Sequence, residues 1–245
     1  MGRLLAITLT LILLPGCNTE RSSDLNTDDI EVKYEIYIPQ KSLNSLFNGV
    51  VPDSDKSRIE ISSFMKTLDS HDKIAAVSLN ENDRINVIYK NVIHEMHRDT
   101  LAFGIHRKSI YDTISDNDNL TIEFVHNEES IKSNIAFGKL PNITSEYEVS
   151  ISSGTPLLLR WNNNSANANR LYLFGSCFGV DPIDLDPLQD NYDFDINELE
   201  MVANDVDTCS GLAVVEWTVI GGISQFFRAG SFTTYLRKWI KFTIE

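Results

Sequence analysis

Three kinds of feature are missing from this chain of 245 residues, and each absence excludes a class of protein. After residue 14, no apolar run reaches the roughly 18 to 20 residues that a membrane-spanning helix needs. The GxSxG and P-loop motifs are absent, so we do not expect an enzyme. Basic residues are few, 21 against 35 acidic ones, and the net charge of −14 argues against a nucleic-acid partner.

The first sixteen residues have the pattern of a signal peptide. Arg3 is followed by an apolar run over residues 4–14, which is too short to cross a bilayer and therefore targets the chain without anchoring it. The run ends in Leu-Pro-Gly-Cys at residues 14–17, which resembles the lipobox of bacterial lipoproteins. That resemblance implies removal of residues 1–16 and lipidation of Cys17, which would anchor the protein on a membrane. An ordinary signal peptide with an incidental cysteine is the alternative.

A polar segment follows the cysteine. Among residues 18–29 only Leu25 is apolar, and such a segment cannot bury enough surface to offset the entropy of ordering. We therefore expect residues 17–29 to form a flexible lipidated tether. In lipoproteins resembling those of enterobacteria, an Asp directly after the lipidated Cys favours the inner membrane. Asn18 stands at that position, so the predicted location is the cell envelope, with the outer membrane favoured over the inner membrane.

Cysteine is scarce, with three in the chain. Once Cys17 carries lipid, Cys177 and Cys209 remain, and an even pair in an oxidising compartment is most simply a disulfide. A metal site or a catalytic thiol would favour a CxxC motif or a neighbouring histidine, and neither cysteine has one. We therefore expect a disulfide between Cys177 and Cys209.

The rest of the chain alternates apolar and polar residues with the period of two that is typical of half-buried strands. The alternation is present in residues 32–38, 85–93, 120–124, 135–137, 157–161 and 192–196, and turn-forming clusters lie at 80–83 and 116–119. Residues 211–220 are nearly all apolar, as in a strand buried on both faces. A turn is predicted at Gly221 and Gly222, and a final strand over 240–244. Residues 42–47 and 62–68 are candidates for short helices.

These patterns predict an all-β fold with two immunoglobulin-like antiparallel β-sandwich domains, over residues 30–145 and 146–245. Trp161, Cys177 and Cys209 lie on predicted strands and resemble the immunoglobulin fold in architecture, although antibodies have the order Cys, Trp, Cys. With the apolar strand after Cys209 and the Gly-rich hairpin, the chain is similar to uncharacterised immunoglobulin-like lipoproteins of Gram-negative bacteria. That resemblance implies no activity.

Histidine is concentrated in one place. His94, His97 and His106 form the densest cluster, and histidine is a common metal ligand. A spacing of three on a predicted strand puts His94 and His97 on opposite faces, and the spacing is not that of an HExxH motif. A zinc site is therefore not expected.

The acidic segment 181–195 offers a second possible metal site. Its Asp184, Asp186 and Asp190 are candidate calcium ligands, because Ca²⁺ binds several carboxylate oxygens. The segment lacks the Gly and the terminal Glu of an EF-hand, and a solvated acidic loop is the alternative. Calcium is the one cofactor that the sequence suggests.

Phe226 and Phe227 lie in the predicted turn between Gly221 and Gly230, where we expect at least one of them to be an exposed contact point. We interpret the chain as a cell-envelope lipoprotein that acts as a binding or structural module through loops or strand edges, with an envelope protein or glycan as partner. A carbohydrate-binding or calcium-dependent adhesive surface protein is the first alternative. An envelope hydrolase is the second, because many carboxylates are available for glycoside chemistry.

Overall fold

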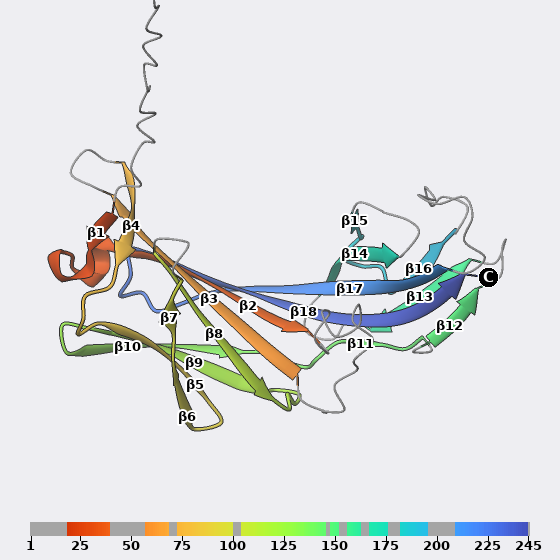
Figure 1. Cartoon of the computed structure of the whole chain (residues 1–245), viewed down its shortest axis with the longest axis horizontal. Helices are drawn as coiled ribbons and strands as arrows, with labels where there is room; N and C mark the ends of the chain where they lie inside the picture. Colours follow the sequence, from red (N-terminus) through yellow and green to blue (C-terminus); the bar gives the residue numbers. More distant parts are fainter. Residues whose placement is uncertain are drawn as a thin grey trace, which may run out of the picture.

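The computed structural model describes residues 19–39, 57–68, 73–99, 104–145, 148–151, 156–162, 167–175, 182–195 and 209–244, and most of them lie in strands (Figure 1). The all-β prediction is therefore confirmed. The helices of the described part are two short 3-10 helices, η1 (Ser22–Asp24) and η2 (Thr27–Asp29). None of these described helices is long and apolar enough to cross a membrane.

The described strands form three sheets. The largest has eleven strands: β1 (Thr19–Arg21), β2 (Glu31–Pro39), β3 (Ser57–Leu68), β4 (Ile74–Ser78), β7 (His97–Arg98), β8 (Ile105–Asp112), β12 (Glu148–Ile151), β14 (Asn167–Gly175), β15 (Ile183–Asp184), β17 (Cys209–Gly222) and β18 (Ala229–Ile244). The second has the order β10 (Glu129–Ala136), β9 (Asn119–His126), β5 (Arg84–Tyr89), β6 (Val92–Glu95). The third has the order β11 (Asn142–Ile143), β13 (Leu157–Asn162), β16 (Asn191–Phe194).

The hairpin of β17 and β18 runs along most of the molecule and joins its two ends (Figure 1). Its antiparallel ladder extends from the pair Cys209 and Ile244 to the pair Gly222 and Ser231. The first part of β18 pairs in parallel with β2, and its last part pairs in parallel with β12. The largest sheet is therefore mixed, and it links the first strands of the chain to the last.

Each smaller sheet packs against the same side of the largest sheet. Residues such as Tyr34 and Phe232 on the largest sheet share one buried cluster with Phe124 on β9. The same cluster contains Trp217 on β17 and Trp161 on β13. We call the part built around the four-stranded sheet the first sandwich, and the part built around the three-stranded sheet the second sandwich.

The alternation of the sequence sets which face of each strand is buried. On β2 the side chains of Val32, Tyr34 and Ile36 are buried, and those between them turn to the other face. Successive residues of a strand point to opposite faces, so this pattern puts one apolar row against the core. The prediction of a strand buried on both faces over residues 211–220 is confirmed for residues 211–217 of β17. It is wrong for residues 218–220, where Ile220 is 74% exposed.

The predicted domain boundary at residue 145 falls within the three-stranded sheet, because β11 precedes it in the chain and β13 and β16 follow it. The largest sheet crosses it, because β18 pairs with β2 on one side of the boundary and with β12 on the other. The division into residues 30–145 and 146–245 therefore stays a prediction about folding units.

Three local predictions are wrong. Residues 62–68 form the end of strand β3 instead of a helix, because Met65 and its alternate neighbours join the core of a sheet. Gly221 and Gly222 belong to β17, and the turn comes after them; a Cβ at Gly221 would lie 2.3 Å from the Phe232 ring, which packs on this glycine. Residues 85–93 are two strands joined at Lys90 and Asn91, both with positive φ. The candidate helix at 42–47 lies outside the described residues.

The flexible tether is also a wrong prediction from Thr19 onward. β1 pairs in parallel with β4, and η1 and η2 follow it directly. Ser22 is completely buried, and the Thr67 hydroxyl donates a hydrogen bond of 2.9 Å to the Asp29 carbonyl. Polar side chains order this segment through hydrogen bonds to the sandwich, which a composition argument based on apolar burial does not detect.

Candidate functional site

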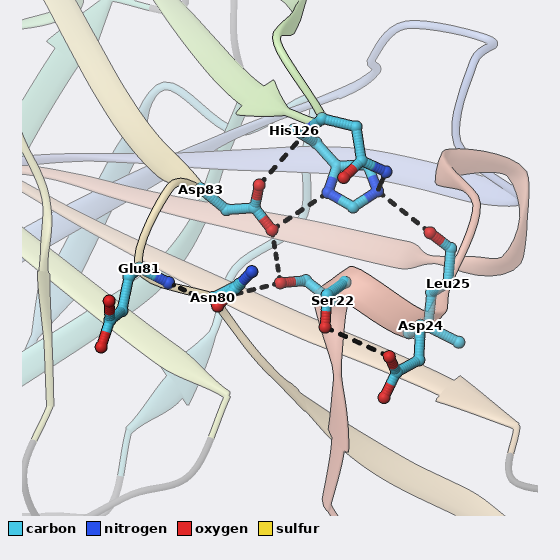
Figure 2. A network of polar contacts seen from close by, with 9 residues as sticks. Ser22, Asp24, Leu25, Asn80, Glu81, Asp83 and His126 are labelled. Carbon is cyan, nitrogen blue, oxygen red and sulfur yellow. Dashed lines mark hydrogen bonds and ion pairs between the residues drawn. The ribbon is translucent and has the colours of Figure 1, made fainter.

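A buried polar network holds the N-terminal segment on the first sandwich (Figure 2). The Ser22 hydroxyl donates to Asp83 Oδ2 at 2.5 Å, and His126 Nδ1 lies 3.0 Å from the same oxygen. On its other side, His126 Nε2 lies 3.0 Å from the Leu25 carbonyl oxygen. The Asn80 N–H donates to Ser22 Oγ at 2.8 Å. The network thus connects the N-terminal segment, the turn before β5 and the end of β9.

This arrangement contains a serine, an aspartate and a histidine, but it is not that of a nucleophilic triad. A triad needs the histidine to accept the proton of the serine hydroxyl, whereas the Ser22 hydroxyl donates to Asp83. Ser22 is also fully buried, so its oxygen is out of reach of a substrate. The role that fits this geometry is to fasten the N-terminal segment.

The charge state of Asp83 follows from the same contacts. Burial acts to raise the pKa of Asp83, but the hydrogen bonds from Ser22 and His126 and the charge of His126 outweigh it, and the pKa is lowered from its ordinary value of 3.8. Hydrogen bonds to the ionised form of a carboxyl favour that form. Asp83 is therefore an ionised acceptor at neutral pH.

An open groove of about 940 Å³ lies beside this network, at the end of the first sandwich. Three segments line it: the N-terminal residues Asn26, Thr27 and Asp28, the β9–β10 turn and its flanks at His126, Asn127, Glu129, Ser130 and Ile131, and the β17–β18 loop at Gln225 and Phe226. The same three segments meet at the left end of the molecule in Figure 1. The groove therefore depends on the docked N-terminal segment for one of its walls.

The lining of the groove is polar and acidic. Asp28 and Glu129 are its acidic side chains, and amides such as Asn127 and Gln225 add donors and acceptors. No lysine or arginine is among these lining residues. A groove with this lining favours a ligand that carries positive charge or many hydroxyl and amide groups.

The two adjacent phenylalanines of the β17–β18 loop differ in burial: one is exposed and the other belongs to the core. Phe226 is 63% exposed at the rim of the groove, whereas Phe227 is 5% exposed and its ring centroid lies 5.8 Å from that of Phe124. The Ser224 N–H donates to Ser133 Oγ of β10 at 3.3 Å, so the loop is also held from the other side. The sequence predicted that at least one of this pair is exposed, and the exposed residue is Phe226. A contact at this residue stays a prediction.

One edge of the four-stranded sheet runs from the groove. β10 is the end strand of this sheet in the described part of the chain, and it joins β9 through the two residues Asn127 and Glu128, both with positive φ. In a two-residue hairpin the closing pair, here His126 and Glu129, exchanges hydrogen bonds, and the alternate residues point their backbone groups outward. We infer that the N–H and C=O of Ser130 and Lys132 face the open edge.

The candidate calcium ligands do not converge in the described residues. Asp184 forms an ion pair with Arg170 at 3.3 Å, and Asp186 Oδ1 accepts a hydrogen bond from the Leu188 N–H. Asp190 Oδ1 accepts one from the side-chain amide of its neighbour Asn191. The described part of the chain holds no group of three His, Cys, Asp or Glu side chains that could bind a metal. Calcium binding stays a prediction.

The three histidines have different surroundings. His94 is half-buried on β6, His97 is exposed on β7, and His106 is buried on β8. Burial, with a smaller contribution from the charge of Arg98, lowers the pKa of His106 to about 4, and its Nδ1 has no hydrogen-bond partner among the described residues. His106 is therefore a neutral core residue at pH 7.

A second polar cluster lies on the opposite, outward face of the largest sheet. Glu216 is 1% exposed and accepts a hydrogen bond of 2.6 Å from Arg237 Nη2 and one of 3.2 Å from the Tyr172 hydroxyl. The Arg237 guanidinium stacks over Tyr37 at 5.2 Å and over Tyr172 at 5.4 Å. Tyr37 in turn stacks on Tyr235. This cluster joins four strands, and it explains how the apolar strand β17 carries a buried acid.

Neither cluster was identified from the sequence. Ser22, Asp83 and His126 are separated by tens of residues, and none belongs to a recognisable motif. The turn at residues 80–83 was predicted, but nothing in its composition indicates that Asp83 points inward.

Of the three cysteines, Cys17 and Cys177 lie outside the described residues, and Cys209 is buried at the start of β17.

Comparisons with known proteins add no family. The sequence matches no protein-family model, and no curated protein is significantly similar to it.

Proposed function

We propose that this protein is a cell-envelope lipoprotein, anchored through Cys17, whose exported part is a binding module. The leader and the Leu-Pro-Gly-Cys sequence support the anchor, and Asn18 supports the outer membrane. The observation that carries the binding function is the open polar groove beside the docked N-terminal segment. No catalytic role is proposed, because the one serine, aspartate and histidine network next to the groove is buried and its serine donates to the aspartate.

The proposed partner is an extended segment of another envelope protein that carries positive charge. Asp28 and Glu129 in the groove would attract a Lys or Arg side chain, and the whole chain has a net charge of −14. The outward backbone groups of Ser130 and Lys132 could pair with the partner as an added strand, which is a common mode of peptide recognition. A second copy of this acidic chain fits less well, since both surfaces would carry negative charge.

Binding of carbohydrate is the second candidate function. The exposed Phe226 ring stands beside the amides of Asn127 and Gln225, so an apolar face and several hydrogen-bonding groups are close together. If binding depended on calcium, Asp184, Asp186 and Asp190 would supply the carboxylate ligands for the ion. Adding Ca²⁺ would then raise the melting temperature of the protein.

The register of the largest sheet supports the proposed disulfide. The last described pair between β14 and β17 joins Gly175 to Gly211. Cys177 lies two residues after the first of these and Cys209 two residues before the second. An antiparallel ladder that continued for two more pairs would bring positions 177 and 209 opposite each other.

The first experiment is intact mass of the membrane-extracted protein with and without reduction, beside a Cys17→Ala variant. We expect the mass of a chain starting at residue 17 with diacylglyceryl attached, and a gain of two hydrogens on reduction. The variant should remain unprocessed and unlipidated. An unlipidated wild-type chain would contradict the anchor, and an unchanged mass on reduction would contradict the disulfide.

The second experiment tests the groove with two probes. One is an acetylated and amidated peptide of alternating Thr and Val with two Lys residues, and the other is a chitin hexasaccharide. We expect the peptide to bind wild-type protein and to lose most of its affinity in the double variant Asp28→Asn, Glu129→Gln. Lys132→Pro removes an outward N–H and should weaken binding, whereas Lys132→Ala keeps it and serves as the control. Binding of the saccharide alone, sensitive to Phe226→Ala, would favour the carbohydrate function instead.

A further inference from the structure

The docked N-terminal segment leaves almost no spacer between Cys17 and the folded body. β1 begins at Thr19, which pairs with Ala76 of β4, and Ser22 just beyond it is buried and bonded to Asp83. Two residues of extended chain span at most about 7 Å. A lipid-bearing Cys17 would therefore have its backbone within that distance of the Thr19 backbone.

Apolar side chains are exposed at the same corner of the largest sheet. Ile74, the first residue of β4, is 69% exposed, and Leu68, which pairs with it from β3, is 38% exposed. Counted back two residues from Thr19, the parallel register of β1 with β4 leads to position 74. The end of the chain that would carry the lipid thus points to the exposed pair.

The surface around this pair combines apolar side chains with lysines and glutamates. A hollow of about 390 Å³ opens beside the pair. Its lining contains apolar residues such as Phe64, Ile74, Ala76 and Ile105 and the charged residues Glu31, Lys33, Glu35 and Lys66. Lys66 borders the hollow in an ion pair with Glu31 at 2.8 Å, and the exposed Lys73 precedes Ile74. Lysine at the border of an apolar surface keeps its stem on that surface while its ammonium reaches the headgroups.

We propose that the corner formed by Thr19, Leu68 and Ile74 rests on the lipid bilayer and sets the orientation of the sandwiches on the membrane. This inference depends on the lipid anchor of the proposed function. The lipid and the two aliphatic side chains enter the same membrane surface, because the stretch from Cys17 to Thr19 is too short for the body to move away. The second sandwich, at the other end of the molecule in Figure 1, does not touch the bilayer at this corner.

The test uses the full, lipid-bearing protein in vesicles of phosphatidylethanolamine and phosphatidylglycerol that contain dibrominated acyl chains, which quench tryptophan at short range. Two variants are compared: Ile74→Trp, and Leu188→Trp as a control that is also highly exposed but lies between β15 and β16 in the second sandwich. We expect quenching of the introduced tryptophan to be at least about threefold greater in Ile74→Trp than in Leu188→Trp, since only the first would lie at the acyl boundary. Wild-type protein gives the signal of the three native tryptophans for subtraction.

A third variant separates the spacer from the surface. Insertion of twelve Gly and Ser residues between Asn18 and Thr19 keeps the lipid and should lower the quenching of Ile74→Trp toward that of the control, because the body is then free to leave the surface. Intact mass of the same sample distinguishes the two ways to fail. A lipidated protein with equal quenching at positions 74 and 188 would overturn the contact and leave the anchor standing, whereas an unlipidated chain would overturn both.

Discussion

Replacement of Asp83 tests whether the buried network holds the N-terminal segment in place. Asp83→Ala removes the acceptor for the Ser22 hydroxyl at 2.5 Å, for His126 Nδ1 at 3.0 Å and for the Asn127 N–H at 3.4 Å. All of these contacts lie in a part of the protein where Ser22 and His126 are buried. Because Ser22 and His126 are buried, water cannot replace the hydrogen bonds that the variant loses.

The expected magnitude follows from these contacts. Hydrogen bonds to a charged group contribute about 1.5–3 kcal/mol each, and removal of one partner from a buried ion pair costs about 3–5 kcal/mol. We therefore expect Asp83→Ala to lower the free energy of unfolding of the N-terminal segment by about 4 kcal/mol. Asp83→Asn keeps an oxygen for Ser22 and His126 but turns an amide toward the Asn127 N–H, so we expect a loss of about 1.5 kcal/mol.

The loss should depend on pH in a defined direction. The pKa of Asp83 is lowered in the folded protein, so its contribution is present above the unfolded pKa near 3.8 and is lost as the pH falls through the folded pKa. The difference between wild type and Asp83→Ala should therefore be full at neutral pH and smaller at about pH 3.

The assay is hydrogen exchange of residues 19–29, with urea unfolding of the same samples followed by circular dichroism. We expect exchange in this segment to be faster by about three orders of magnitude in Asp83→Ala, which corresponds to 4 kcal/mol. Glu81→Ala, an exposed change two residues away, serves as the control (Figure 2). Unchanged exchange in this segment, or equal losses for the Ala and Asn variants, would refute the reasoning.

Three further predictions concern the core and the outward cluster. Glu216→Ala should lower the free energy of unfolding by about 3 kcal/mol in urea, because Arg237 keeps a half-buried charge without its partner. The double variant Glu216→Leu, Arg237→Met should recover most of that loss. A double variant as unstable as the single one would contradict this prediction. His106 has a folded pKa of about 4 against an ordinary 6.5, so the unfolded state takes up its proton first and stability should fall as the pH drops below 6.5 and level off below about 4. His106→Met should remove that slope from the pH profile of the urea midpoint, and an unchanged slope would exclude His106 as its cause. Gly221→Val should lower the free energy of unfolding by about 2 kcal/mol, because its Cβ would overlap the Phe232 ring. The control is Gly222→Val, since a Cβ at Gly222 has no neighbour within 4 Å. An equal loss in both variants would rule out that overlap as the cause.

Much of the secondary structure could be predicted from the sequence, because a half-buried strand leaves a pattern of period two. Strand β2, with Val32, Tyr34 and Ile36 buried, and strand β9 were both predicted from such alternation. The candidate site was predicted only at Phe226, through its place in a loop. The pattern does not predict which strands pair with each other. It also predicts no ordered structure for the polar residues 19–29.

The sequence by itself determined the all-β class, the buried face of alternating strands such as β2 and β9, and the expectation of a leader with a lipidated Cys17. These depend on residues that are close together in the chain. The tertiary structure decided that β18 pairs in parallel with β2, nearly two hundred residues away, and that Ser22, Asp83 and His126 meet in one network. As a result, the segment that was expected to be a flexible tether forms one wall of a groove. Such contacts form only after distant segments are packed together, because the hydrogen bonds that order a polar segment belong to the surface on which it docks.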